Sequence, residues 1–271
     1  MTTRSKTKRD GSMKRSSASK QLLNPASKSS GLAKTYAGLV FVRRFQNALA
    51  KNQLLPRGSK VLIAVSGGPD SVALLALLVR LREKHGFVLR AAHVNYGLRG
   101  RDSNRDEALV QKLCQTWSVP LSLLRPKEKP ENNIEERLRI IRYRFFERIR
   151  KRYAFDLIVT AHTMNDVAET LLLNLIRGAG HRGLSPFQRP LPLVVRPLVY
   201  FQKSAIEKFL TAESLPFRID RTNTSKRFTR NRVRHELLPL LQTFNPSIIE
   251  TLARTAAALG ETHKKTVDIT S

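Results

Sequence analysis

Short runs of consecutive apolar residues alternate along the chain with longer stretches in which apolar residues recur every three or four positions. The short runs are rich in valine, isoleucine and leucine and show no alternation, which is typical of parallel strands covered on both faces. The longer stretches have the periodicity of helices that bury one face. Together they predict an α/β fold, a Rossmann-like, doubly wound, mostly parallel five-stranded sheet with helices on both faces. The predicted strands are 61–65, 88–95, 120–127, 156–162 and 193–198.

Helical periodicity fills the intervals between these runs and continues after the last of them. Gly86 is placed to end the helix after the first strand, and Asn132 or Asn133 is placed to cap the helix after the third. Pro197 indicates that the last strand lies at an edge, where a missing N–H is tolerated. The other predicted helices are 39–54, one opened by Asp102-Ser103, one beginning around Asn165, 203–213, one ending near Leu241, and 247–259, the last forming a short C-terminal extension.

The sharpest break in this pattern comes directly after the first predicted strand. There the chain continues as Ser66-Gly67-Gly68-Pro69-Asp70-Ser71, and an apolar helical pattern begins at Val72. Two adjacent glycines let the backbone turn sharply and bring its N–H groups close to a ligand. The helix that follows adds free N–H groups and a dipole, both of which attract an anion. The stretch therefore predicts a phosphate-binding loop.

This loop lacks the Gly-Lys-Ser/Thr of a Walker A motif and the Gly-x-Gly-x-x-Gly of a dinucleotide-binding turn. It resembles the Ser-Gly-Gly-x-Asp-Ser loop of the ATP-pyrophosphatase (PP-loop) superfamily, whose members split ATP into AMP and pyrophosphate. The alternative is an ordinary strand-to-helix turn in which Asp70 or Ser71 caps the helix. The presence of all six residues at the end of an apolar run favours the phosphate loop.

Histidines and carboxylates follow two of the other predicted strands. His93 and Asn95 end the second strand, and His162 ends the fourth. The carboxyl ends of strands in an open α/β sheet line its ligand crevice, so these side chains are expected to face a nucleotide. Asp166 and Glu169 fall in the first turn of the next predicted helix, where acids suit the helix dipole. The functional alternative is a Mg²⁺ site, because Mg²⁺ takes one or two carboxylates together with phosphate oxygens.

The charge of the chain points to a polyanionic partner. Its 271 residues include 49 Lys and Arg against 21 Asp and Glu, a formal net charge of +28. Basic residues are dense in 137–152 and 218–234, so a basic tail alone does not explain the excess. Nucleic acid is the natural ligand of such a surface. For the helix within 137–152, a merely solvated charged face is the alternative.

Cysteine content and hydropathy exclude several classes of protein. Cys114 is the single cysteine, which excludes a disulfide framework, a cysteine-rich zinc site and an iron–sulfur cluster. Its apolar helical surroundings predict a small core residue. No apolar run is long enough to span a membrane, and no membrane partner is expected. One cysteine fits a reducing compartment, and we expect a cytoplasmic protein.

Residues 1–38 are rich in Ser, Lys and Arg and contain few bulky apolar residues. Burial cannot offset the entropy of ordering such a segment, so it is predicted to be a disordered basic arm that adds RNA affinity. An organellar transit peptide is the alternative. The predicted organisation is this arm, an ATP-binding catalytic domain at 39–242, and a C-terminal helix and tail at 243–271.

Several motifs, taken in order, resemble the tRNA(Ile)-lysidine synthetase family over roughly residues 58–246. The phosphate loop alone would identify only the superfamily, and the later motifs separate this family from GMP synthetase and NAD synthetase. These later motifs are His93-Val94-Asn95-Tyr96-Gly97-Leu98-Arg99, Arg139-x-x-Arg142-Tyr143, Ala161-His162 with Asp166-x-x-Glu169-Thr170, Arg177-Gly178-Ala179-Gly180, Arg182-Gly183-Leu184, Arg196-Pro197-Leu198, Asp220-x-x-Asn223 and Arg230-Asn231-x-x-Arg234.

The resemblance implies a ligase that modifies tRNA with ATP. ATP would adenylate the carbonyl oxygen of the wobble cytidine in tRNA-Ile with a CAU anticodon, releasing pyrophosphate. The ε-amine of free L-lysine would then displace AMP to give lysidine. A homodimer is left open.

The same resemblance assigns roles to individual residues. Asp70 and Asp166 would coordinate Mg²⁺ together with Glu169, position lysine or accept its proton, because the amine must be neutral to attack. Arg139, Arg142 and Arg234 would stabilise phosphate charge or hold the tRNA backbone. The residues expected to bind the nucleotide are Ser66, Gly67, Gly68, Pro69, Asp70, Ser71, His93 and His162.

Three positions depart from the commonest form of one family motif, Ala-His-His-x-Asp-Asp-Gln-Ala-Glu-Thr. Here they are Thr163, Asn165 and Val167, and Asn165 removes one acid from the predicted metal site. Two other functions are alternatives. A single cysteine argues against a PP-loop tRNA thiolase, and the intact phosphate loop argues against a non-catalytic RNA-binding relative.

Overall fold

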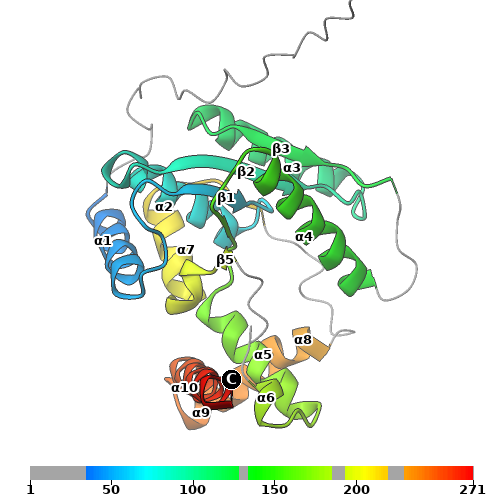
Figure 1. The fold of residues 1–271 in the computed structure, drawn as a ribbon. Helices are drawn as coiled ribbons and strands as arrows, with labels where there is room; N and C mark the ends of the chain where they lie inside the picture. The colour runs from blue at the N-terminus through cyan, green and yellow to red at the C-terminus, as the bar shows by residue number, and fades with distance from the viewer. Residues whose placement is uncertain (1–34, 128–133, 185–192, 219–228, 271) are drawn as a thin grey trace, which may run out of the picture. The chain divides into compact units, whose positions relative to one another are not determined.

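The computed structural model describes residues 35–127, 134–184, 193–218 and 229–270 (Figure 1). All of them belong to one unit, Gly31–Ser271. In chain order the elements are α1 (Tyr36–Lys51), β1 (Lys60–Ala64), α2 (Pro69–His85), β2 (Val88–Val94), α3 (Arg101–Thr116), β3 (Leu121–Leu124), α4 (Ile134–Arg152), β4 (Leu157–Val159), α5 (Met164–Ile176), α6 (His181–Leu184), β5 (Val194–Val195), the 3₁₀ helix η1 (Pro197–Tyr200), α7 (Lys203–Ala212), α8 (Thr229–Arg232), the π-helical turn η3 (Val233–Leu237), α9 (Leu238–Phe244) and α10 (Ile248–Thr270).

The five strands form one sheet in the order β3-β2-β1-β4-β5, and every neighbouring pair is parallel. β1 is central, with Ile63 opposite Ala91 of β2 on one side and Val159 of β4 on the other. The chain adds strands to one side of β1 and then to the other, so the topological switch point lies beside β1. Ligands of doubly wound sheets bind at this point. The predicted fold class is confirmed.

Two apolar cores cover the two faces of the sheet. Val61 and Ile63 of β1 belong to a core formed with α1, α2, α3 and α7, whereas Leu62 belongs to a second core formed with α4. Successive side chains of a strand point to opposite faces, and all three of these are fully buried. This explains why the strand is apolar at every position. In the described part of the chain, α4 is the helix that covers the second face (Figure 1).

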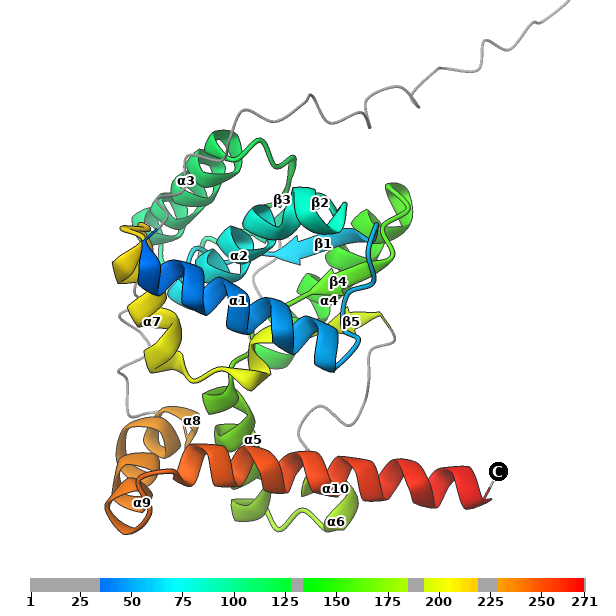
Figure 2. The same cartoon turned by 90° about the vertical axis from the view of Figure 1, so that its left-hand side faces the viewer.

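A third group of apolar side chains joins segments that are far apart in the chain. Ala168 and Leu172 of α5 pack together with Val233, Leu238 and Ile249 from η3, α9 and α10. Figure 2 shows α10 crossing α5, and the two helices are in contact. This packing brings the arginines of α8 and η3 next to the carboxylates of α5.

Element boundaries differ from the predicted ones mainly at the sheet edges. β3 covers four residues rather than eight, and β5 only two, because Pro197 starts η1 instead of continuing the strand. The edge position of β5 is confirmed. Gly86 ends α2 with φ +70°, as predicted. α3 begins at Arg101, one residue earlier than predicted, and α10 continues to Thr270.

Several predictions lie outside the described residues: most of the basic arm at 1–38, the cap at Asn132 or Asn133, and the Asp220-x-x-Asn223 motif. The domain boundaries at 38 and 242 stay predictions, and α1 begins at Tyr36. Cys114 is buried, and burial raises the pKa of its thiol to about 12, which confirms a core residue. Within the described ranges, no helix combines the length and the apolarity needed to cross a lipid bilayer.

Candidate active site

One hydroxyl group shapes the phosphate loop. Ser71 Oγ accepts hydrogen bonds from the backbone N–H groups of Ser66 and Gly67, each at 3.1 Å, and donates to the Gly68 carbonyl at 2.9 Å. Gly67 has φ +92°, a conformation that L side chains rarely adopt. The N-cap of α2 is Gly68, without a side-chain cap bond, and Pro69 follows. The capping role of Asp70 or Ser71, which belonged to the alternative of an ordinary turn, is therefore wrong, whereas phosphate binding by the loop stays a prediction.

A cavity of about 330 Å³, which we call the phosphate cavity, lies over this loop. Its walls come from widely separated parts of the chain, and they carry more cations than acids. Positive charge around a glycine-rich turn at a helix N-terminus suits a bound triphosphate. The cationic lining residues are Arg99, Lys203, Arg218 and Arg234, and the acidic ones are Asp70, Asp106 and Glu207.

Asp70 is an acid of this cavity whose carboxylate is incompletely satisfied. Its Oδ1 is buried and has no hydrogen-bond partner in the described part of the chain. Burial is the largest influence and raises the pKa of Asp70 to about 6, whereas the positive charges of Lys203 and Arg234 act to lower this pKa. A buried carboxylate oxygen without a partner, beside a glycine-rich loop at a helix N-terminus, is suited to a divalent cation.

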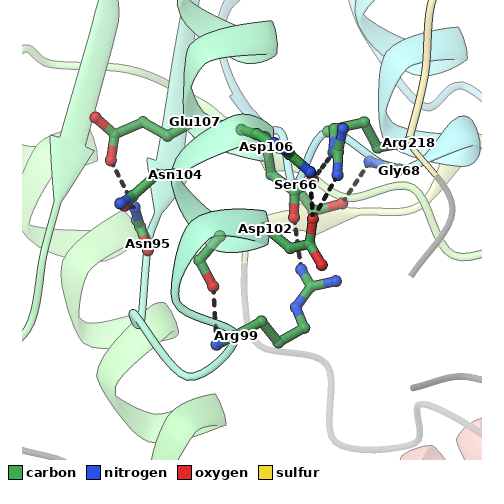
Figure 3. A network of polar contacts seen from close by, with 12 residues as sticks. Ser66, Gly68, Asn95, Arg99, Asp102, Asn104, Asp106, Glu107 and Arg218 are labelled. Carbon is green, nitrogen blue, oxygen red and sulfur yellow. Dashed lines mark hydrogen bonds and ion pairs between the residues drawn. The ribbon is translucent and has the colours of Figure 1, made fainter. Parts of the chain in front are cut away.

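Figure 3 shows how α3 and the segment after α7 hold the loop. Arg218 donates from Nε to Asp106 at 2.7 Å and from Nη2 to Asp102 at 2.9 Å, and its backbone N–H donates to the Gly67 carbonyl at 3.1 Å. Arg99 donates to the other oxygen of Asp106 at 2.5 Å. A Cβ on Gly67 would lie 3.4 Å from the Asp106 carbonyl oxygen, so α3 also packs against the loop backbone. One buried carboxylate thus orients two of the cavity's arginines.

The sequence patterns did not identify Asp102, Asp106, Lys203 or Arg218 as site residues. The only signal was the density of basic residues that begins at Arg218. Their grouping depends on contacts between segments more than 100 residues apart, which local patterns do not encode.

A second cavity of about 190 Å³ lies at the ends of β1, β2 and β4. Ser66 and Ala161 line both cavities, so the two adjoin. Its other walls are mostly apolar or aromatic, which suits a planar base. Its lining residues also include Val65, Val94, Tyr96, Arg142, Tyr143, Phe146, Thr160 and His162.

The α4 motif Arg139-x-x-Arg142-Tyr143 lies at this second cavity. Both guanidinium groups are near the ring of Tyr143, at 5.9 Å for Arg139 and 5.8 Å for Arg142, within the range of cation–π attraction. Arg142 lines the cavity, whereas Arg139 lines neither cavity and has a side chain that is 55% exposed. The two arginines therefore gather around one aromatic ring, as their spacing of three predicts.

The two predicted histidines have different surroundings. His93 is buried, lines neither cavity, and donates from Nδ1 to the Val65 carbonyl at 2.7 Å. His162 lines the second cavity, with its Nδ1 2.9 Å from the Thr160 hydroxyl. Burial lowers the pKa of both rings, that of His162 to about 4, so both are neutral at pH 7. Asn95 donates to Glu107 at 2.8 Å and supports the strand end.

Asp166 belongs to the cap of α5. Thr163 is the N-cap: its backbone N–H donates to Asp166 Oδ2 at 2.8 Å, and its hydroxyl accepts from the Asp166 N–H. Burial acts to raise the pKa of Asp166, but the hydrogen bond from the Thr163 N–H and the charges of Arg230 and Arg234 hold that pKa below its usual range. Thr163, one of the three positions that differ from the family motif, thus forms a capping box with Asp166.

Glu169 lies in the second turn of α5, not in the first as predicted, and is 1% exposed. Arg234 donates to its two oxygens at 2.6 and 2.9 Å, and Arg230 donates to one of them at 2.9 Å. Both arginines also approach Asp166 Oδ1, at 3.3 and 3.4 Å. Arg234 lines the phosphate cavity, so this buried network fixes the position of its guanidinium group there.

Asn165, another of the three departures, joins α5 to α7. Its Oδ1 accepts a hydrogen bond at 2.8 Å from the backbone N–H of Lys203, the first residue of α7. The N-cap of α7, Gln202, makes no side-chain cap bond. Asn165 therefore caps α7 from a neighbouring helix and fixes the position of Lys203 at the phosphate cavity.

We expect Asn165→Ala to reduce the free energy of unfolding by about 1 kcal/mol, the usual value of a helix cap. The KM for ATP should rise severalfold while kcat changes less, because Lys203 loses its anchor. Thermal unfolding and steady-state ATP kinetics measure the two effects. Asn165→Asp keeps an acceptor oxygen, so its stability and its KM for ATP should stay close to those of the unchanged protein. An unchanged KM in Asn165→Ala would contradict the role of Asn165 in positioning Lys203.

Comparisons with known proteins give a consistent result. The family model of the PP-loop domain matches residues 39–241. The tRNA(Ile)-lysidine synthase of Gloeobacter violaceus is 41% identical over 223 residues, which cover 80% of this chain and 67% of that protein. The enzyme of the same name from Clostridium acetobutylicum is 37% identical over 216 residues, which cover 77% of this chain and 47% of that protein. The chain thus spans about half the length of several curated relatives that it matches.

Among solved structures, the U34-tRNA thiolase NcsA from Methanococcus maripaludis is similar, with a TM-score of 0.70 over 83% of this chain and 80% of that one. The two sequences are 19% identical. This likeness supports the fold.

Proposed function

This chain belongs to the tRNA(Ile)-lysidine synthase family of PP-loop proteins, and on that premise we propose that it attaches L-lysine to the wobble cytidine of a tRNA-Ile with a CAU anticodon. The reaction would consume ATP and release AMP and pyrophosphate. The observation that carries the proposal is the phosphate loop with Asp70 beneath a cavity lined by four cations.

In the first step, the leaving pyrophosphate gains negative charge. The backbone N–H groups of Asp70 and Ser71 in the first turn of α2 and the side chains of Lys203 and Arg218 would bind that charge, which lowers the barrier most when the groups are already oriented. Asp106 and the Gly67 carbonyl hold Arg218 in place before any ligand arrives. The base of ATP would then lie in the second cavity, whose wall at Ser66 is shared with the phosphate cavity.

The residues present fit a divalent cation. Asp70 offers a buried oxygen that has no hydrogen-bond partner among the described residues. Asp166 is close enough to raise the pKa of Asp70, but its two oxygens already contact Thr163, Arg230 and Arg234, so its place in the metal site stays a prediction. A bound Mg²⁺ would neutralise phosphate charge. Glu169, the third predicted ligand, already accepts hydrogen bonds from Arg230 and Arg234 on both oxygens, and its place in the metal site stays a prediction.

In the second step, the lysine amine must lose a proton to attack. As an alternative to binding a cation, Asp70 is a candidate for the acceptor, because without a bound cation its pKa is raised to about 6, which makes it a better base than an ordinary aspartate. Arg234 lines the cavity and can stabilise phosphate charge, whereas the catalytic role of Arg139 stays a prediction. Homodimer formation and a cytoplasmic location also stay predictions.

The thiolase alternative is disfavoured by the state of the single cysteine. Burial raises the pKa of the Cys114 thiol to about 12, so it is neither ionised nor accessible for sulfur transfer. A non-catalytic RNA-binding relative has no need of a buried, unpartnered acid beside a glycine-rich loop.

The direct test is transfer of labelled lysine to an isoleucine tRNA transcript with a CAU anticodon, with and without ATP. We expect ATP-dependent labelling that disappears when the wobble cytidine is replaced by uridine. ATP cleavage without labelling would leave the nucleotide site in place and exclude lysine transfer to this tRNA.

A further inference from the structure

α4 carries a row of four cations that neither cavity uses. Their positions are separated by seven, four and three residues, so at 3.6 residues per turn they follow one side of the helix over about 21 Å. All four are exposed. We call this row the α4 stripe, and its members are Arg137, Arg144, Arg148 and Lys151.

The stripe faces away from the protein interior. A different side of α4 is buried against the sheet through Phe145, Phe146 and Ile149. α4 also lies on the face of the sheet that α1, α2 and α7 do not cover (Figure 1). None of the described segments therefore covers the outer side of α4, which can receive a large ligand.

Acidic side chains do not neutralise the stripe. Arg137, Arg144 and Arg148 form no ion pair with a carboxylate in the described ranges, and Lys151 is 3.7 Å from Glu147, which also binds Arg150. Like charges four residues apart, such as Arg144 and Arg148, destabilise a helix. A face that served only for solubility would mix charges of both signs. A row of one sign that costs stability favours a polyanionic ligand.

The stripe also begins near the candidate active site. Arg142 and Tyr143, on the same helix, line the second cavity. The N-terminal part of α4, from Ile134 to Ile140, is exposed except for Leu138, which is half-buried. The Leu138 carbonyl, next to Arg137 in the chain, accepts a hydrogen bond at 2.9 Å from the Tyr96 hydroxyl, and Tyr96 lines the second cavity. The N-terminal end of the stripe therefore lies near this cavity, although the stripe is on a different side of α4 from Arg142 and Tyr143.

We propose that the α4 stripe binds the sugar–phosphate backbone of the tRNA. The identity of the RNA rests on the proposed function, whereas the mode of binding rests on the stripe itself. Rows of arginine contact phosphates without reading sequence, so the stripe holds the substrate in position. It has no part in ATP cleavage.

The test is a triple variant, Arg137→Gln, Arg144→Gln and Arg148→Gln, since glutamine keeps the helix propensity while removing the charge. Binding of the tRNA-Ile transcript is measured without ATP or lysine, so the result does not depend on the proposed reaction. We expect affinity to fall about tenfold or more, and the slope of log K against log salt to become shallower by about 2 to 3. The kcat at saturating tRNA should not change.

A matched control removes three exposed cations from α1 and α3: Arg43→Gln, Lys51→Gln and Lys112→Gln. It lowers the net charge by the same amount and should bind tRNA within about twofold of the unchanged protein. Thermal unfolding of both variants verifies that they fold. Equal weakening of the two variants, which indicates a diffuse charge effect, would overturn the proposal. So would unchanged affinity and salt dependence in the stripe variant.

Discussion

Asp70→Asn is expected to reduce the rate of ATP cleavage about 1000-fold or more while tRNA affinity stays within about twofold. The substitution keeps the shape of the side chain and removes the charge that a cation or an attacking amine requires. Asp70 lies at the floor of the phosphate cavity, whereas the α4 stripe proposed to hold the tRNA is on another helix. Single-turnover cleavage of ATP and equilibrium binding of the tRNA transcript measure the two quantities separately.

The same variant should be more stable than the unchanged protein at pH 7. Burial raises the pKa of Asp70 from 3.8 to about 6, so the folded state holds this proton more tightly than the unfolded state. The associated stability is fully present below about pH 4 and is lost as the pH rises through 6. Asparagine carries no charge, so it avoids the cost of burying an ionised carboxylate. The Tm of the variant should therefore rise by a few degrees at pH 7 and depend less on pH between 4 and 6. A lowered Tm together with lost tRNA binding would instead assign Asp70 a folding role.

Glu169→Gln is expected to lower the free energy of unfolding by about 3 kcal/mol or more. Glu169 is 1% exposed and accepts hydrogen bonds from Arg230 and Arg234. Removing one member of a buried ion-pair network leaves its partners without a counter-charge. For a chain of this size the Tm should fall by about 6 °C or more. Glu136→Gln is the control, because that carboxylate is 64% exposed and its closest approach to Arg139 is 3.8 Å, so its loss should cost little.

This variant also separates two roles for Glu169. If the arginine network is its main function, the Mg²⁺ concentration that gives half-maximal ATP cleavage should stay within about twofold. A tenfold increase in that concentration with an unchanged Tm would show that Glu169 is a metal ligand, as the family resemblance implies.

Local patterns predicted the fold class because each strand and helix is encoded within its own segment. The run around Leu62 is apolar throughout because both faces of a central parallel strand are buried. Patterns were less informative about side-chain direction. His93 was placed correctly at a strand end, but its Nδ1 bonds to the Val65 carbonyl, and neither cavity includes it. A strand pattern places a residue along the sheet without showing which neighbour its ring will meet.

The sequence by itself determined the phosphate loop, because the hydrogen bonds that shape it join residues no more than five apart, such as Ser66 and Ser71. Only the tertiary structure decided which charges surround that loop. Arg218 and Asp106 are 112 residues apart, and Arg234 and Glu169 are 65 apart. These pairs meet because the strand order brings α3, α5 and the segments after α7 to the carboxyl edge of one sheet. A short-range motif cannot specify such contacts, since they depend on how whole layers pack.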